Sequence, residues 1–112
     1  MDAQAELANL QKVYPAAELW DEGGQPLAFI PGLCFRSAGG IIKTDAVLCP
    51  RRHSSAGYPT RLFLRQQVPN RGQNWSQHVI RGLSGWWSPS YDNVPPSMPW
   101  LEILAAHLRG YE

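Results

Sequence analysis

The stretch that decides the predicted fold is GGIIKTDAVLCPRRH, residues 39–53. Its paired glycines predict a turn, and the residues after them alternate with a period of two. Lys43 and Asp45 point to one side of this predicted strand. The other side carries the residues Ile42, Thr44, Ala46 and Leu48. The sequence therefore predicts a half-buried strand that ends at Cys49-Pro50, followed by an exposed polar loop over residues 51–57.

Strands are also expected on both sides of this central one. Apolar residues at 27–30 and 33–35 read as two strand pieces, interrupted by Pro31-Gly32. Proline and glycine in a strand mark a bend or a bulge, so we expect one of these there. Residues 61–65 alternate well enough to form the next strand. The simplest connection between these strands is an antiparallel meander.

Helices are predicted at both ends of the chain. Asp2 is a suitable N-cap for a helix over residues 3–13, which Pro15 stops because it has no amide hydrogen. Ser97 is the expected N-cap of a final helix, with Gly110 at its exit. One face of that helix carries Trp100, Ile103, Leu104 and Leu108.

Residues 69–99 are rich in Asn, Gly, Ser, Pro and Trp, so we expect an irregular segment held in place by aromatic rings, with a short extended piece at 78–80. The predicted fold class is α+β: an N-terminal helix, an antiparallel sheet meander, an irregular Trp-rich segment and a C-terminal helix. The length of 112 residues predicts a single domain over residues 1–112.

Composition restricts the class of partner. The chain has 44% hydrophobic and 17% charged residues, which is enough apolar surface for a core. Its net charge of +1 makes nucleic acid an unlikely partner. With neither a run long enough to span a membrane nor a secretion signal, we expect no membrane partner and a cytoplasmic location. Cys34 and Cys49 are then expected to be free thiols.

Several short motifs point to one known family. The run from Gly39 to Pro50 begins with paired glycines and ends in an apolar-Pro step, and Gly57-Tyr58-Pro59 contains a Tyr-Pro turn. Residues 86–89 read Trp-Trp-Ser-Pro, and residues 101–108 follow as the predicted helix. This order resembles the ubiquitin-conjugating enzyme (UBC-like) superfamily, especially its diverged bacterial members in ubiquitin-like conjugation systems.

The resemblance implies a UBC-like fold and a set of partners. These partners are a ubiquitin-like protein, a ubiquitin-activating-like enzyme that the first helix and neighbouring loops contact, and a target protein. The family usually carries its nucleophilic cysteine shortly before Trp-Ser-Pro, but residues 74–80 contain no cysteine. The His-Pro-Asn motif is also absent, although Pro69-Asn70 stands in the corresponding region. Antiviral defence is a pathway that the resemblance suggests.

Cys49 is the predicted relocated nucleophile. Nearby cations favour the attacking thiolate, and Arg51, Arg52 and His53 follow it closely. We expect its sulfur to face solvent at the strand end, with His53 assisting proton transfer. The opposite interpretation, that Cys49 is a small core residue, stays open. Cys34 lies between Leu33 and Phe35 and is expected to serve packing only.

Two further residues complete the predicted catalytic set. Asn74 is expected to stabilise an oxyanion, and His78 lies beside the family's usual active-site position. A loop histidine bonded to the backbone is an equally ordinary interpretation of His78, and His107 is expected to be structural. No cofactor is expected, and the Cys and His spacings do not fit an ordinary structural zinc site.

Two functional hypotheses follow. In the first, the chain is a conjugating transferase that accepts a bacterial ubiquitin-like modifier as a thioester on Cys49 and transfers it to an amine. In the alternative, it is a catalytically inactive UBC-fold scaffold that binds a modifier or a conjugation partner. The missing cysteine before Trp86-Trp87-Ser88-Pro89 motivates the alternative.

Overall fold

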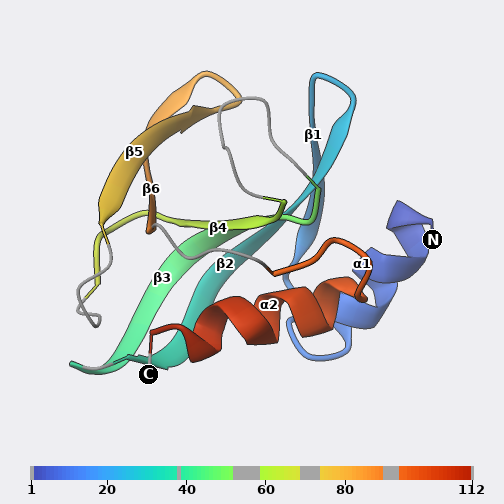
Figure 1. Ribbon diagram of the computed structural model, residues 1–112. Helices are drawn as coiled ribbons and strands as arrows, with labels where there is room; N and C mark the ends of the chain where they lie inside the picture. The colour runs from blue at the N-terminus through green and yellow to red at the C-terminus, as the bar shows by residue number, and fades with distance from the viewer. Residues whose placement is uncertain (1, 38, 52–58, 69–73, 90–93, 112) are drawn as a thin grey trace.

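The computed structural model describes residues 2–37, 39–51, 59–68, 74–89 and 94–111. It is an α+β structure in which an N-terminal helix and a C-terminal helix lie on the same side of a six-stranded antiparallel sheet (Figure 1). The elements are α1 (Ala3–Gln11), β1 (Glu18–Glu22), β2 (Gln25–Ser37), β3 (Gly40–Cys49), β4 (Arg61–Leu64), β5 (Trp75–Ile80), β6 (Leu83–Pro89) and α2 (Trp100–Arg109). Within the described residues, neither helix has the length and apolar character needed to cross a membrane.

The strand order is β1-β2-β3-β4-β6-β5. The strands β2, β3 and β4 form the predicted meander, and β3 lies between β2 and β4 near the middle of the sheet. Strand β1, which pairs with β2, was not predicted. The last two strands form a hairpin that joins the sheet through β6, where Trp87 pairs with Leu64 of β4. The central strand predicted from residues 42–48 is therefore confirmed in both type and position.

Helix α1 begins as predicted and ends slightly early. The Asp2 carboxylate accepts a hydrogen bond from the backbone N–H of Gln4 at 3.1 Å, which confirms the N-cap. The helix ends at Gln11, before the predicted residue 13. The backbone N–H groups of Val13 and Tyr14 both bond to the carbonyl of Leu10, so the last turn tightens before Pro15 is reached.

The predicted interruption at Pro31-Gly32 is a bulge within one continuous strand. The pairing register between β2 and β3 shifts between Ile30 and Leu33. Gly32 has a φ of 62°, a conformation that glycine adopts without strain. Its N–H donates to the Asp45 carboxylate on β3 at 2.8 Å, so the bulge is fastened to the neighbouring strand.

The two faces of the sheet carry two separate apolar clusters. The larger cluster lies under the helices and includes Leu10 of α1, Leu48 of β3 and Ile103 of α2. The smaller cluster lies on the opposite face and consists of Leu27, Val47, Cys49, Phe63, Ile80 and Trp86. We call it the second cluster. Because Val47 and Cys49 belong to it, the end of β3 is buried on both faces, whereas the sequence predicted a half-buried strand.

The second cluster is closed by contacts between the first and last hairpins. The backbone N–H of Arg81, in the β5–β6 turn, donates to the carboxylate of Glu22 at the end of β1. The Arg81 guanidinium lies 4.6 Å from the centre of the Trp20 ring, and the Trp20 and Trp86 rings meet edge to face at 6.3 Å. The sheet is thus curled enough to bring hairpins from its two ends together.

The prediction of an irregular segment over residues 69–99 is wrong for the β5–β6 hairpin, although the extended piece predicted at 78–80 is confirmed as part of β5. Ile80 pairs with Leu83, so only Arg81 and Gly82 form the turn, and their φ angles are 52° and 77°. Positive φ at both central residues is what a type I′ hairpin turn requires. The predicted aromatic anchoring is confirmed for Trp86 and Trp100, which are both buried.

Candidate functional site

Cys49 stands at the end of β3, directly opposite Arg61 of β4. Only 1% of the residue is exposed, so the expectation that its sulfur faces solvent is wrong. The thiol donates a hydrogen bond to the Arg51 carbonyl at 2.9 Å. The physical reason is the curl of the sheet, which covers this face with the second cluster. Burial agrees with the alternative interpretation of Cys49 as a core residue.

The surroundings of Cys49 disfavour the thiolate. Burial raises the pKa of the Cys49 thiol to about 12, the Glu22 carboxylate acts in the same direction, and the Arg61 guanidinium opposes it. Burial outweighs the cationic neighbour because it removes the water that would solvate the sulfur anion. At neutral pH the side chain is therefore a protonated thiol, the weakly nucleophilic form.

The other predicted catalytic residues are not gathered around this thiol. His53 lies outside the described residues. Asn74 is exposed just before β5. His78 is half-buried on β5, with Nε2 3.0 Å from Ser76 Oγ and its ring 5.1 Å from that of Phe63. Phe63 belongs to the second cluster, so His78 borders the group that contains Cys49, yet no hydrogen bond between these two described residues is formed. The catalytic roles of His53, Asn74 and His78 stay predictions.

Cys34 is the exposed cysteine, in contrast to its predicted packing role. Its neighbours Leu33 and Phe35 are buried under the helices, and alternation along β2 turns Cys34 to the opposite face. Its partner across the strand pair is Lys43, which is also exposed. Beyond the bulge at Gly32, the second cluster no longer covers this face, so the thiol meets solvent.

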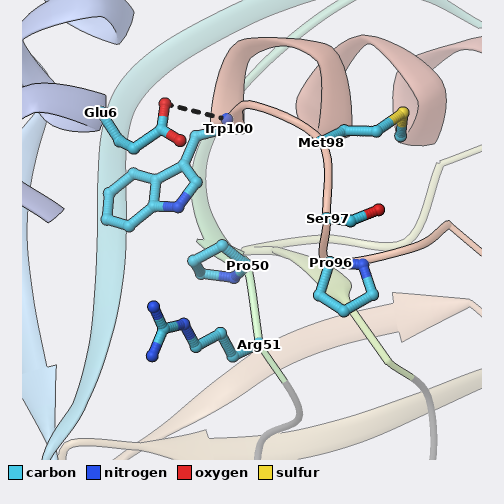
Figure 2. A pocket seen from close by; sticks show the side chains of 7 residues that line it. All are labelled: Glu6, Pro50, Arg51, Pro96, Ser97, Met98 and Trp100. Atoms are coloured by element: carbon cyan, nitrogen blue, oxygen red, sulfur yellow. Dashed lines mark hydrogen bonds between the residues drawn. The ribbon is translucent and has the colours of Figure 1, made fainter. Parts of the chain in front are cut away.

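A pocket opens where the chain leaves β3, next to Cys49. It has a volume of about 160 Å³ and lies between α1, the residues after β3 and the start of α2 (Figure 2). Its lining residues are Glu6, Pro50, Arg51, Pro96, Ser97, Met98 and Trp100. Two residues of the predicted 49–53 segment, Pro50 and Arg51, therefore belong to a cavity even though the cysteine beside them is buried.

The start of α2 corrects the prediction that Ser97 is its N-cap. The cap position is Pro99, which makes no capping hydrogen bond through its side chain. Instead, the backbone N–H of Trp100 donates to the carboxylate of Glu6, a residue of α1, at 3.4 Å. Glu6 is only 5% exposed. A side chain 94 positions away in sequence thus takes the place of the local cap.

Glu6 was not predicted as a site residue, although the sequence carries a signal for it. Glu6 and Leu10 are four residues apart, so they share one helix face, and Leu10 is fully buried. A carboxylate on the buried face of a helix needs a partner. Local pattern does not identify that partner, because the meeting of α1 with the start of α2 depends on the whole sheet between them.

The arrangement at this pocket is suited to binding. It combines a buried carboxylate, an exposed guanidinium and the Ser97 hydroxyl with the rings of Pro50 and Trp100, and none of the described residues that line it is a cysteine. Among residues 2–37, 39–51, 59–68, 74–89 and 94–111, no three His, Cys, Asp or Glu side chains lie where they could hold a metal ion. No protein-family model, curated protein or solved structure matches this chain.

Proposed function

We propose that this chain is a non-catalytic, UBC-like binding protein that holds a ubiquitin-like modifier or a conjugation partner as a scaffold. The observation that carries the proposal is the state of Cys49, the cysteine in the segment where chemistry was predicted. Its thiol is buried, bonded to the Arg51 carbonyl and protonated at neutral pH. A thioester carrier needs an accessible thiolate instead.

The sequence motifs and the fold support the same proposal. The N-terminal helix, the antiparallel meander and the C-terminal helix occur in the order that the UBC-like resemblance implies, although the β5–β6 hairpin stands where an irregular segment was expected. The loop where that family carries its nucleophile has no cysteine over residues 74–80. The pocket beside Pro50 and Arg51 gives this end of the sheet a place for part of a partner to bind. A cytoplasmic location remains a prediction from the sequence, and a role in bacterial antiviral defence remains a prediction of the resemblance.

Thioester transfer on Cys49 is the competing proposal. In that reaction the Cys49 thiolate attacks the modifier's carboxyl carbon and displaces the thiolate of the activating enzyme, and an amine later displaces Cys49. This chemistry requires the end of β3 to separate from Arg61 and the second cluster before the sulfur can react. The exposed Cys34 makes a second thiol available in any such assay, and it has to be controlled.

The decisive experiment measures intact mass and binding together. The protein is incubated with a candidate ubiquitin-like protein, its activating enzyme and ATP, and its mass is read with and without reductant. The same modifier and enzyme are titrated separately by calorimetry. We expect saturable binding to at least one partner and no reducible adduct.

Two matched cysteine variants show which thiol is responsible if a reducible adduct does form. A reducible adduct that is lost in Cys49→Ala and kept in Cys34→Ala establishes the thioester enzyme and overturns the scaffold. Melting curves of both variants show whether the substituted protein is still folded. If a competent modifier and activating enzyme neither bind nor form an adduct, both proposals fail for that conjugation system.

A further inference from the structure

Glu6 combines deep burial with few hydrogen-bond donors. It is 5% exposed, and its carboxylate receives one bond, the long 3.4 Å contact from the Trp100 backbone N–H. An ionised carboxylate has about four acceptor positions, so most of them are left without a donor from the described part of the chain. The oxygen without a protein donor is not sealed from solvent, since Trp86 Nε1 is the fully buried side-chain atom without a partner among the described residues. A donor that enters the pocket can therefore reach this oxygen.

The unbonded side of this carboxylate faces the pocket. Figure 2 shows one Glu6 oxygen directed at the Trp100 backbone nitrogen, while the other turns toward the space enclosed by the labelled side chains. The residues that line this space include the apolar Trp100, Pro50 and Met98 and the polar Arg51 and Ser97. Trp100 and Pro50 offer apolar contact and an aromatic ring, and Glu6 is the buried charged side chain of the lining.

Arg51 does not neutralise this carboxylate. Figure 2 shows its guanidinium well apart from Glu6, and Arg51 is exposed. No ion pair between these two described residues is formed. The pocket therefore has an anionic group in its buried part and a solvated cation at its edge, and a ligand that reaches the buried part meets negative charge.

The size of the pocket limits what can enter it. Its volume of about 160 Å³ is below the roughly 300–1,000 Å³ of pockets that enclose a whole drug-sized ligand. One extended side chain or the first residue of a chain is of a suitable size. The occupant is thus the end of a larger partner, or a small free molecule.

We propose that the pocket binds a primary ammonium group, with its nitrogen on the Glu6 carboxylate and its carbon chain against Trp100, Pro50 and Met98. An ammonium supplies three donors, and its bonds to a carboxylate are charge-assisted. The Trp100 ring adds apolar contact and attraction for a cation. This inference deepens the binding function proposed above. It rests on that function for the identity of the larger partner that carries the ammonium group.

A titration followed by two-dimensional ¹H–¹⁵N NMR tests the site with defined probes. N-acetyl-lysine methylamide presents a side-chain ammonium, alanine methylamide presents an α-ammonium, and N-acetyl-norleucine methylamide is the neutral control. We expect saturable shifts at the Trp100 amide with at least one ammonium probe and none with the control. The probe that binds more tightly identifies whether a lysine or a chain terminus is the source.

Glu6→Gln is the decisive variant because it removes the charge but keeps an oxygen for the Trp100 N–H. We expect it to weaken ammonium binding at least tenfold. Met98→Trp, which fills the pocket without changing Glu6, is the second variant and is expected to abolish the shifts. The inference is overturned by the absence of saturable shifts with both ammonium probes, or by unchanged affinity in Glu6→Gln.

The ammonium site and the scaffold function can each be overturned without the other. If Glu6→Gln still binds the ubiquitin-like modifier and the ammonium probes do not bind the unsubstituted protein, the ammonium site is overturned and the scaffold function stands. If the probes bind at Glu6 but no conjugation partner binds, the ammonium site is supported and the scaffold function is overturned.

Discussion

The hydroxyl oxygen of Thr60 lies 2.8 Å from Nε2 of His107, and the same hydroxyl donates to the Val94 carbonyl at 2.8 Å. Because the single hydroxyl proton is used for Val94, Nε2 of His107 must be the donor in the other bond. Burial, followed by the charge of Arg61, lowers the pKa of His107 to about 4. The ring is therefore neutral at neutral pH, which agrees with the predicted structural role of His107.

The first prediction concerns stability between pH 7 and pH 4. In the unfolded chain His107 takes up a proton near its ordinary pKa of 6.5, whereas in the folded protein it does so only near 4. The unfolded state thus binds more protons in this window, and the free energy of unfolding falls as the pH is lowered through it. We expect a loss of up to about 3 kcal/mol from this histidine, measured by urea denaturation at each pH.

His107→Gln is the matched variant because its side-chain amide can still donate to Thr60 and does not titrate. The difference in unfolding free energy between the unsubstituted protein and the variant should shrink as the pH falls from 7 to 4. His78→Gln serves as the control histidine. A pH-independent difference for His107→Gln contradicts the prediction.

The second prediction concerns the two thiols. A maleimide or iodoacetamide should add once to the native protein, at the exposed Cys34, and twice after unfolding. A pKa of about 12 for Cys49, against an ordinary value of 9.0, reduces its thiolate fraction roughly a thousandfold at pH 8 before access is considered. Intact mass over time measures the rates. Rapid native labelling that persists in Cys34→Ala is the contrary result.

The third prediction concerns the β5–β6 turn. Gly82 has a φ of 77°, a conformation that is strained for residues with a Cβ, although an added Cβ would meet open space. Gly82→Ala should therefore lower the free energy of unfolding by about 1–2 kcal/mol through backbone strain alone. Thermal or urea denaturation measures the change. Gly82→Asn should cost less, since asparagine tolerates this region, so an equal cost for both contradicts the explanation.

The fourth prediction tests whether the second cluster contributes to stability. Phe63 is fully buried in it, and Phe63→Ala should lower the free energy of unfolding by about 3–5 kcal/mol. Val79→Ala is the control, because Val79 is 55% exposed and should change stability by less than about 0.5 kcal/mol. Similar effects of the two substitutions on the urea midpoint would show that the second cluster is not a packed core.

Much of the fold is encoded by local pattern and is predictable for that reason. The alternation over residues 42–48 gives the helix-facing side of β3, and Pro31-Gly32 gives the bulge in β2. Asp2 has the side chain that an N-cap needs, and it makes the expected bond. In each case the deciding interaction joins near neighbours or follows from a period of two.

The errors have two sources, a weak local signal and the effect of distant segments. The turn at Arg81-Gly82 lacks the usual Asn-Gly signal, so the sequence does not predict the hairpin. The curl of the sheet then buries Cys49 and leaves Cys34 exposed, which reverses the environments expected for the two thiols. Neighbouring arginines suggested a reactive Cys49, but the desolvation that decides its pKa comes from strands on both sides of it in the chain, from β2 to β6.

The packing of α2 against the larger cluster affects the order of folding during synthesis. The larger cluster cannot close until α2 has left the ribosome, because Ile103 and Leu104 cover part of the sheet. Until then, the helix-facing side of β2 and β3 is exposed to water and to other chains. We therefore expect nascent chains that end before residue 100 to depend on chaperones, since such exposed strand surface is prone to aggregation.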